Sequence, residues 1–132
     1  MEQEIAVFIV SHGNLAQAML QTVEKIIGPQ NNVFTFTNSK DSLPSLAEQI
    51  KKQLNEIGAR QVIFFIDMMG GSCWALANMI RREYPTIAII TGVNLPMLLS
   101  CFTNISELSF PKLVQKVKES GLRGIQSFAG GS

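Results

Sequence analysis

The sequence predicts an α/β fold, a doubly wound and mostly parallel sheet in the strand order 2-1-3-4 with helices on both faces. Three short apolar runs, residues 5–10, 62–66 and 87–90, have the length and continuity of strands buried on both faces. Segments with the helical spacing of apolar residues separate these runs. Parallel neighbours need right-handed crossovers, which place helices on both faces of the sheet.

The first half of the chain contains a helix, a strand and a second helix after the first apolar run. Apolar residues recur at helical spacing over residues 15–27, and the Gly28-Pro29 pair ends that helix. Residues 32–37 alternate β-branched and aromatic side chains, which is typical of a strand at or near an edge. Ser42 is expected to be the N-cap of the next helix, which ends before Gly58.

The second half repeats the pattern. The strand at 62–66 leads through a glycine turn into a helix over 73–84, which Pro85 closes. The strand at 87–90 is followed by a short helix near Pro96. The sequence therefore continues to alternate strands with helices.

The last part of the chain is expected to hold one more helix and a short strand. Pro111 opens the helix, which is predicted to end before Gly121. Residues 125–128 are predicted to form a small fifth strand. Residues 129–132 are small and are predicted to form a flexible tail, so that residues 1–128 make a single domain.

Composition narrows the classes of partner and cofactor. A formal net charge of +1 without a basic cluster argues against nucleic acid. Residues 1–4 are polar and no apolar run is long enough to span a membrane, which predicts a cytoplasmic protein without membrane insertion. With one histidine, His12, and two separated cysteines, Cys73 and Cys101, the usual ligands of a metal site are missing, so no metal and no cofactor are expected.

A candidate catalytic pair follows from the predicted topology. In doubly wound sheets, sites form beyond the carboxyl ends of the strands, where the strand order reverses. The order 2-1-3-4 makes His12, after the first strand, and Asp67, after the third, neighbours across that crevice. A carboxylate that accepts the proton of one ring nitrogen fixes the tautomer and stabilises the cation formed when the other nitrogen attacks. Asp67 is therefore predicted to orient His12 as a nucleophile.

Two turns beside this pair are predicted to bind a phosphoryl group. Each precedes a helix, where free backbone N–H groups and the positive end of the helix dipole favour an anion. Glycine allows close approach of the backbone, and a serine hydroxyl adds a further hydrogen bond. The predicted phosphoryl-binding residues are Gly13, Asn14, Gly70, Gly71 and Ser72.

Three segments carry a resemblance to a known family. Residues 9–13 (IVSHG), 67–72 (DMMGGS) and 92–98 (GVNLPML) resemble, in order and spacing, the motifs of the mannose/fructose/sorbose IIA family of the sugar phosphotransferase system (PTS). The likeness covers nearly the whole chain. It departs from the family where Cys73-Trp74-Ala75 follow Ser72, because the family commonly has proline, an aromatic residue and asparagine there.

The resemblance implies a phosphotransferase that works through a phosphohistidine. His12 would accept a phosphoryl group from HPr and pass it to a IIB domain, which serves a membrane permease complex. Asp67 and Ser72 match the family's aspartate and serine. The resemblance also implies a homodimer in which the C-terminal strand, residues 125–128, can be exchanged between subunits.

Three alternatives remain open at this point. The chain could be the phosphotransfer subunit of a dihydroxyacetone kinase system, which shares the fold. It could be a phosphate-ligand sensor or regulatory module that binds without transferring, because fold alone does not define function. A third hypothesis makes Cys73 the nucleophile, since a thiol at a helix N-terminus near a histidine can have a depressed pKa.

Overall fold

A computed structural model describes residues 5–38, 43–58, 61–84 and 86–131 of the chain. The expected N-cap Ser42 and the helix-closing Pro85 lie outside these residues. No helix in these ranges combines the length and the apolar character needed to cross a membrane. The elements are β1 (Ile5–His12), α1 (Leu15–Ile27), β2 (Val33–Asn38), α2 (Leu43–Ile57), β3 (Gln61–Ile66), α3 (Ser72–Glu83), β4 (Ile87–Thr91), α4 (Leu95–Asn104) and α5 (Phe110–Arg123).

The sheet has the predicted topology. Its four strands are parallel and lie in the order β2-β1-β3-β4, which confirms the expected α/β fold. β1 is a central strand, and its Phe8 pairs with Phe34 of β2 and with Phe64 of β3. Six of the eight residues of β1 are buried apolar residues, as expected for a strand covered on both faces.

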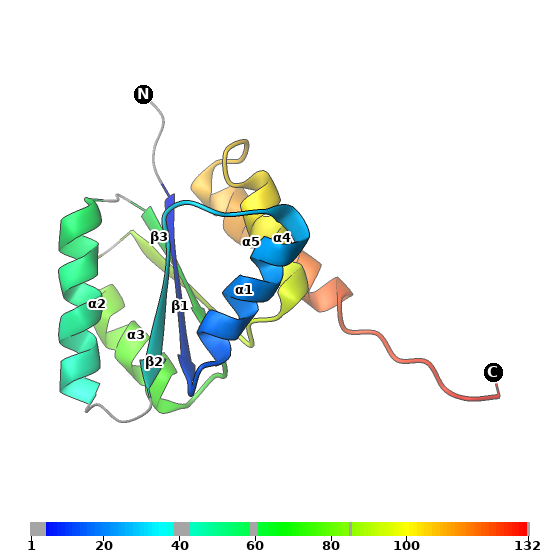
Figure 1. The fold of residues 1–132 in the computed structure, drawn as a ribbon, viewed down its shortest axis with the longest axis horizontal. Helices are drawn as coiled ribbons and strands as arrows, with labels where there is room; N and C mark the ends of the chain where they lie inside the picture. Colours follow the sequence, from blue (N-terminus) through cyan, green and yellow to red (C-terminus); the bar gives the residue numbers. More distant parts are fainter. Residues whose placement is uncertain (1–4, 39–42, 59–60, 85, 132) are drawn as a thin grey trace.

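Helices cover both faces of the sheet and divide the core in two. α2 and α3 lie on one face, and α1, α4 and α5 lie on the other (Figure 1). Alternate residues of β1 point to opposite faces, so Phe8 packs with α2 and α3 while Ile9 packs with the other three helices. The Phe8 and Phe64 rings stack with their centroids 5.3 Å apart. Both faces of the sheet are therefore covered by packed apolar side chains.

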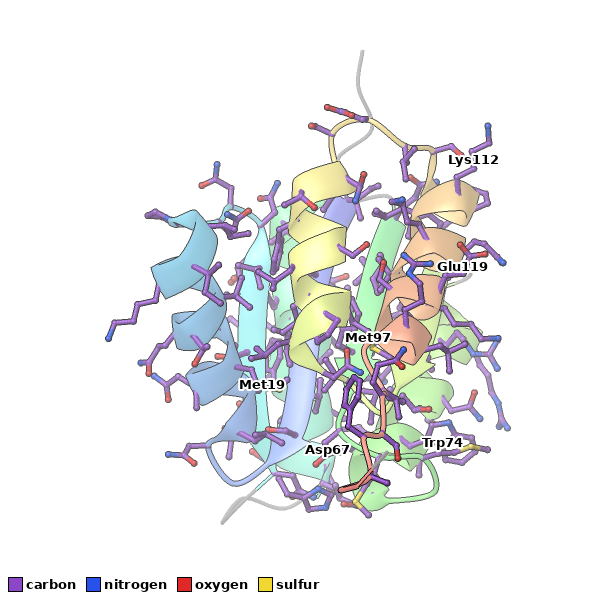
Figure 2. All side chains as sticks on the ribbon, turned by 90° about the vertical axis from the view of Figure 1, so that its right-hand side faces the viewer. Met19, Asp67, Trp74, Met97, Lys112 and Glu119 are labelled. Atoms are coloured by element: carbon purple, nitrogen blue, oxygen red, sulfur yellow. The ribbon has the colours of Figure 1, made fainter. Side chains whose placement is uncertain are left out.

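Helix α5 continues past the residue where the sequence predicted its end. Gly121 lies inside the helix, which runs to Arg123. A Cβ atom at position 121 would come within 2.6 Å of both Cγ and Cε of Met97, a residue of α4 that Figure 2 labels. The glycine therefore permits close packing of α5 on α4, and that packing outweighs its weak helix propensity.

The C-terminal segment, residues 125–131, contains no strand, so the predicted fifth strand at 125–128 is not confirmed. Beyond α5 this segment extends away from the body of the molecule (Figure 1). Its large apolar side chains stay in solvent, with Ile125 exposed by 70% and Phe128 by 91%. In a single chain this segment does not pair with an edge of the sheet.

Candidate functional site

The strand ends bring the candidate residues to one edge of the sheet. His12 is the last residue of β1, Asn38 is the last residue of β2, and Asp67 directly follows β3. Because the strands are parallel, their carboxyl ends lie at the same edge, and the register pairs His12 with Asn38. Helix α3 begins beside them at Ser72. Figure 2 shows Asp67 at the opposite end of the molecule from Lys112.

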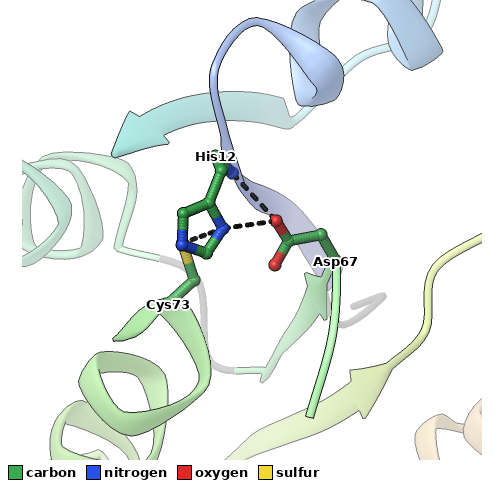
Figure 3. A group of neighbouring side chains, drawn as sticks. All are labelled: His12, Asp67 and Cys73. Atoms are coloured by element: carbon green, nitrogen blue, oxygen red, sulfur yellow. Dashed lines mark hydrogen bonds and ion pairs between the residues drawn. The ribbon is translucent and has the colours of Figure 1, made fainter. Parts of the chain in front are cut away.

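His12 is bound to Asp67 through both its ring and its backbone (Figure 3). The ring Nδ1 lies 2.7 Å from Oδ2 of Asp67, and the backbone N–H of His12 donates to the same oxygen at 2.9 Å. The other carboxylate oxygen accepts the N–H of Met68 at 2.9 Å. The predicted proximity of His12 and Asp67 is thus confirmed, and the carboxylate is fixed by three donors.

The electrostatics of this pair define the tautomer of a neutral His12. Burial of Asp67 alone would raise its pKa, but the hydrogen bonds from the ring and backbone of His12 together hold the pKa below its ordinary value. An ionised carboxylate only accepts hydrogen bonds, so Nδ1 must carry the ring proton. The lone pair of the neutral ring therefore lies on Nε2, and the side chain of His12 is 47% exposed.

Ser72 and Asn38 lie on the Nε2 side of the ring. Oγ of Ser72 is 3.2 Å from Nε2 of His12. The same oxygen accepts a hydrogen bond of 2.7 Å from Nδ2 of Asn38. A continuous chain of hydrogen bonds thus runs from Asn38 through Ser72 and His12 to Asp67, and we call these four residues the His12 cluster.

Cys73 lies against the ring of His12 but is not an exposed thiol. Its Sγ is 3.8 Å from Nδ1, and the residue is fully buried. Burial, followed by the negative charge of Asp67, raises the pKa of the Cys73 thiol to about 11. A protonated, buried thiol is a poor nucleophile, which weighs against the thiol-nucleophile hypothesis.

One group of metal-ligating side chains occurs in the described part of the chain, formed by His12, Asp67 and Cys73. Their ligand atoms lie within 4.8 Å of one another. The facing atoms of His12 and Asp67 already share a hydrogen bond, so a cation would have to displace the Nδ1 proton as well as the thiol proton. This arrangement is suited to holding a proton between imidazole and carboxylate.

The predicted phosphoryl-binding residues differ in how close they come to His12. Gly71 is adjacent, since a Cβ atom there would lie 3.6 Å from Cε1 of the ring. Gly13 and Gly70 adopt the left-handed conformation, with φ of 58° and 84°, in the turns before α1 and α3. Asn14 stands at the N-cap position of α1 without a side-chain capping bond. In the described ranges, no hydrogen bond joins Gly13, Asn14 or Gly70 to the His12 ring.

Sequence reasoning assigned no role to two residues that shape this edge. Ser11 is completely buried, and its Oγ accepts the backbone N–H of Ala16 at 2.7 Å, which anchors the start of α1 behind His12. Asn38 lies just beyond the range predicted as an edge strand, and no role is predicted for it. A signal for Asn38 existed in principle, because a polar residue at the carboxyl end of a parallel strand lies at the site edge.

The loop between β3 and α3 also presents exposed apolar side chains. Met68 is 55% exposed and Met69 is 73% exposed, and both follow Asp67 directly. Flexible methionine side chains are common at surfaces that adapt to partners. A Cβ atom at Gly71 would lie 3.6 Å from both Cγ of Met68 and Cε1 of His12, so this apolar surface begins close to the ring.

The sequence matches a protein family over most of its length. Residues 6–118 match the family described as "PTS system fructose IIA component" (EIIA-man). The chain is 32% identical over 127 residues to the PTS system mannose-specific EIIAB component of Escherichia coli (strain K12), covering 93% of this chain and 39% of that protein. It is 27% identical over 124 residues to the PTS system fructose-specific EIIA component of Bacillus subtilis (strain 168), covering 92% and 85%.

Solved structures agree with these sequence relatives. The phosphotransferase system component EIIA from Streptococcus agalactiae has a TM-score of 0.88 at 25% identity, covering 94% of this chain and 97% of that one. The mannose/sorbose-specific IIA subunit from Enterococcus faecalis has a TM-score of 0.86 at 20% identity, with 98% of both chains covered. The second of these is a likeness of fold.

Proposed function

The chain belongs to the family of PTS system fructose IIA components, a mannose-type IIA group, and from this premise we propose that it is a phosphocarrier. In this proposal, His12 accepts a phosphoryl group from phospho-HPr and passes it to a IIB domain. The observation that carries the proposal is the 2.7 Å contact between Nδ1 of His12 and Oδ2 of Asp67. It leaves the Nε2 lone pair for attack on phosphorus.

In the proposed transfer, His12 is the nucleophile and Asp67 stabilises the cation that forms. Nε2 of His12 attacks the phosphorus of phospho-HPr, a new nitrogen–phosphorus bond forms, and the bond to the donor's nitrogen breaks with its electron pair left on the donor. The imidazole becomes a cation, because Nδ1 keeps its proton. Asp67 stabilises that cation through the short hydrogen bond, and the reverse steps deliver the phosphoryl group to IIB.

The phosphoryl oxygens need hydrogen-bond donors, and α3 supplies them in this proposal. Helix α3 begins at Ser72 without a side-chain cap, so the N–H groups of its first turn remain available to an anion. Gly71 lies beside Cε1 of His12, and Ser72 already reaches Nε2. We assign a supporting role to Gly13, Asn14 and Gly70, which shape the two turns.

Partner docking is proposed for the exposed apolar surface next to His12. Met68 and Met69 offer adaptable contacts to HPr and IIB as each approaches the ring. Transfer rates that stay unchanged in Met69→Ala would count against this assignment. The protein is further proposed to act in the cytoplasm as one domain, residues 1–128, beside a membrane permease complex.

A homodimer is proposed on the basis of the C-terminal segment. Ile125 and Phe128 are exposed by 70% and 91% in one chain, and β4 is an edge strand of the sheet. An exchanged segment that paired with the partner's β4 would bury these side chains and close that edge. This arrangement agrees with the exchanged strand that the family resemblance implies.

The central test is phosphorylation of the intact chain. The protein is incubated with phosphoenolpyruvate, enzyme I and HPr, and its mass is measured before and after mild acid. One acid-labile phosphoryl group that is absent in His12→Ala is the expected result. No gain of mass with active HPr would overturn the proposal and favour the sensor hypothesis.

A further inference from the structure

Asn38 is held next to His12 by the pairing of two strands. It is the last residue of β2 and the register partner of His12 in the parallel ladder, so both side chains leave the same face of the sheet. From this position its Nδ2 donates to Oγ of Ser72 at 2.7 Å, which is short for a neutral N–H to oxygen bond. Asn38 therefore contacts His12 only through Ser72 in the hydrogen-bond chain.

This contact determines which way the Ser72 hydroxyl points. A serine hydroxyl has one proton to donate and two lone pairs that accept. The amide of Asn38 donates to one lone pair, so the proton of Ser72 is left for another acceptor. Nε2 of His12, at 3.2 Å, is that acceptor, because Nδ1 already carries the ring proton.

We propose that Asn38 is a positioning residue that keeps the Ser72 hydroxyl a hydrogen-bond donor at Nε2 of His12 and, after transfer, at an oxygen of the bound phosphoryl group. The proposal deepens the phosphocarrier function and rests on it for its kinetic part. Neither the sequence motifs nor the comparisons with related proteins assign a role to this residue.

The direction of the hydroxyl matters because phosphoryl oxygens accept hydrogen bonds and do not donate them. A hydroxyl whose proton already points toward Nε2 needs only a small rotation to reach an oxygen of a group bound there. A hydroxyl with its lone pairs toward Nε2 would repel both the nucleophilic nitrogen and the incoming anion. Donors oriented before the reaction stabilise developing charge without reorganisation.

The contact of Asn38 with α3 supports the same assignment. The Nδ2 of Asn38 donates to Oγ of Ser72, the first residue of α3, so the amide reaches the start of that helix as a donor.

The test compares two substitutions that differ in the direction of the hydrogen bond. Asn38→Asp has almost the same shape but places an acceptor where the donor stood, so Ser72 turns its proton toward the introduced carboxylate and away from His12. Asn38→Ala removes the partner without adding charge. Thr37→Val is the control, because Thr37 is the neighbouring residue of β2 and its side chain points to the other face.

The first readout is the nitrogen NMR spectrum of His12, the one histidine of the chain. In the wild type, the Nε2 signal of the neutral ring is expected to show a hydrogen-bonded lone pair, with the proton on Nδ1. In Asn38→Asp this signal is expected to move toward that of a free lone pair, while Nδ1 keeps its proton. An unchanged Nε2 signal in both variants would overturn the proposal.

The second readout is the rate of phosphoryl transfer at saturating phospho-HPr. Asn38→Asp and Asn38→Ala are expected to lower kcat about tenfold, the effect of one hydrogen bond, with KM for phospho-HPr unchanged. In a Ser72→Ala background the same Asn38→Ala change is expected to have no further effect, because its influence passes through Ser72. An equal loss in both backgrounds would contradict the proposal and indicate a structural role.

The two proposals fail in different ways. If the wild type accepts no phosphoryl group, the phosphocarrier function is wrong, and the Nε2 signal still decides whether Asn38 directs the hydroxyl. If the wild type is phosphorylated but Asn38→Ala transfers at the wild-type rate, the role of Asn38 is wrong and the carrier function stands. Thermal unfolding of each variant separates a loss of fold from a loss of positioning.

Discussion

The His12 cluster and the C-terminal segment both reach the surface of the molecule, but they differ in whether their side chains find partners within the same chain. In the cluster, each polar side chain has a hydrogen-bond partner within the same chain. In the C-terminal segment, Ile125 and Phe128 carry large apolar surfaces that the same chain leaves uncovered. The comparison teaches that the hydrogen bonds of the His12 cluster are made within one chain, whereas the C-terminal segment leaves its large apolar side chains uncovered.

The largest expected effect is at the charge that completes the site. Asp67→Asn preserves the shape of the side chain but removes the charge that, in the proposed mechanism, stabilises the His12 cation. Phosphoryl transfer is expected to fall by about 100-fold or more, in the range of a lost acid–base partner. The measurement is the single-turnover rate from phospho-HPr.

Glu83→Gln is the matched control for this change. It also converts a carboxylate to an amide, but in a surface ion pair with Lys51 at 3.0 Å, where exposed pairs contribute little. Its transfer rate is expected to equal that of the wild type. A rate for Asp67→Asn within about twofold of the wild type would mean that the cluster does not depend on its charge.

The next largest effect is expected when the C-terminal segment is removed. A chain that ends at Gly124 lacks the C-terminal segment and is expected to be a monomer, whereas the full chain is expected to be a dimer. Burying a phenylalanine or isoleucine side chain contributes about 1.5–3 kcal/mol each, enough to change the dissociation constant more than tenfold. Sedimentation or light scattering over a range of concentrations measures the change.

The shortened chain also tests whether the site is complete in one chain. Its phosphoryl acceptance is expected to stay close to that of the full chain, since the His12 cluster takes no partner from the segment. Gln126→Ala, which changes a polar side chain of the same segment, is the control and should still dimerise. If the shortened and full chains associate equally, the C-terminal segment does not drive dimerisation.

A smaller effect is expected at the helix from which the segment extends. Gly121→Ala forces a Cβ atom to within 2.6 Å of Met97 unless the α4–α5 contact opens. The free energy of unfolding is expected to fall by about 1–3 kcal/mol, the usual cost of overpacking. Urea unfolding measures it at one fixed protein concentration.

Gly130→Ala is the matched control, because a Cβ atom there meets no atom within 4 Å. Its stability is expected to equal that of the wild type. If both alanine variants unfold alike, the tight approach of α5 to α4 contributes nothing to stability. Phosphoryl acceptance should persist in either variant, since a Cβ atom at Gly121 meets Met97 and not a residue of the His12 cluster.

The smallest expected effect is a pH dependence of the stability that Asp67 contributes to the His12 cluster. The pKa of Asp67 is lower in the folded chain than in the unfolded one, so its stabilisation is fully present above about pH 4, the unfolded value. It is lost as the pH falls through the lower folded pKa. The stability difference between wild type and Asp67→Asn should therefore shrink as the pH falls below about 4, as measured by urea unfolding.

The C-terminal segment gives the contrast for this acid dependence. Ile125 and Phe128 do not titrate, so their contribution to association should not follow the same pH profile. A difference between wild type and Asp67→Asn that stays constant down to the acid limit would contradict the assigned pKa direction.

Much of the fold could be predicted because its strands are buried on both faces. Such strands appear as continuous apolar runs, and with the helical spacing between them they led to the order 2-1-3-4. The contact of His12 with Asp67 followed from that order. Local propensity misled where packing overrides it, as at Gly121, where the sequence predicted a helix end.

Asn38 shows what the sequence could not provide. Its place beside His12 depends on the exact register of β2 against β1, and a shift of one residue would turn its side chain to the other face. Periodicity identifies a strand but does not set its register against a neighbour. The strand predicted in the C-terminal segment is missing for a related reason, because an apolar stretch does not reveal whether its partner surface belongs to the same chain.

The half-exposed ring of His12 has a consequence for the order in which HPr and IIB can bind in the proposed relay. Nδ1 is occupied by Asp67, so one nitrogen of one side chain must serve both HPr and IIB. Two partners that need the same atom exclude each other. Transfer from HPr to His12 and transfer from His12 to IIB must therefore alternate. An excess of either unphosphorylated partner should act as a competitive inhibitor of transfer with the other partner.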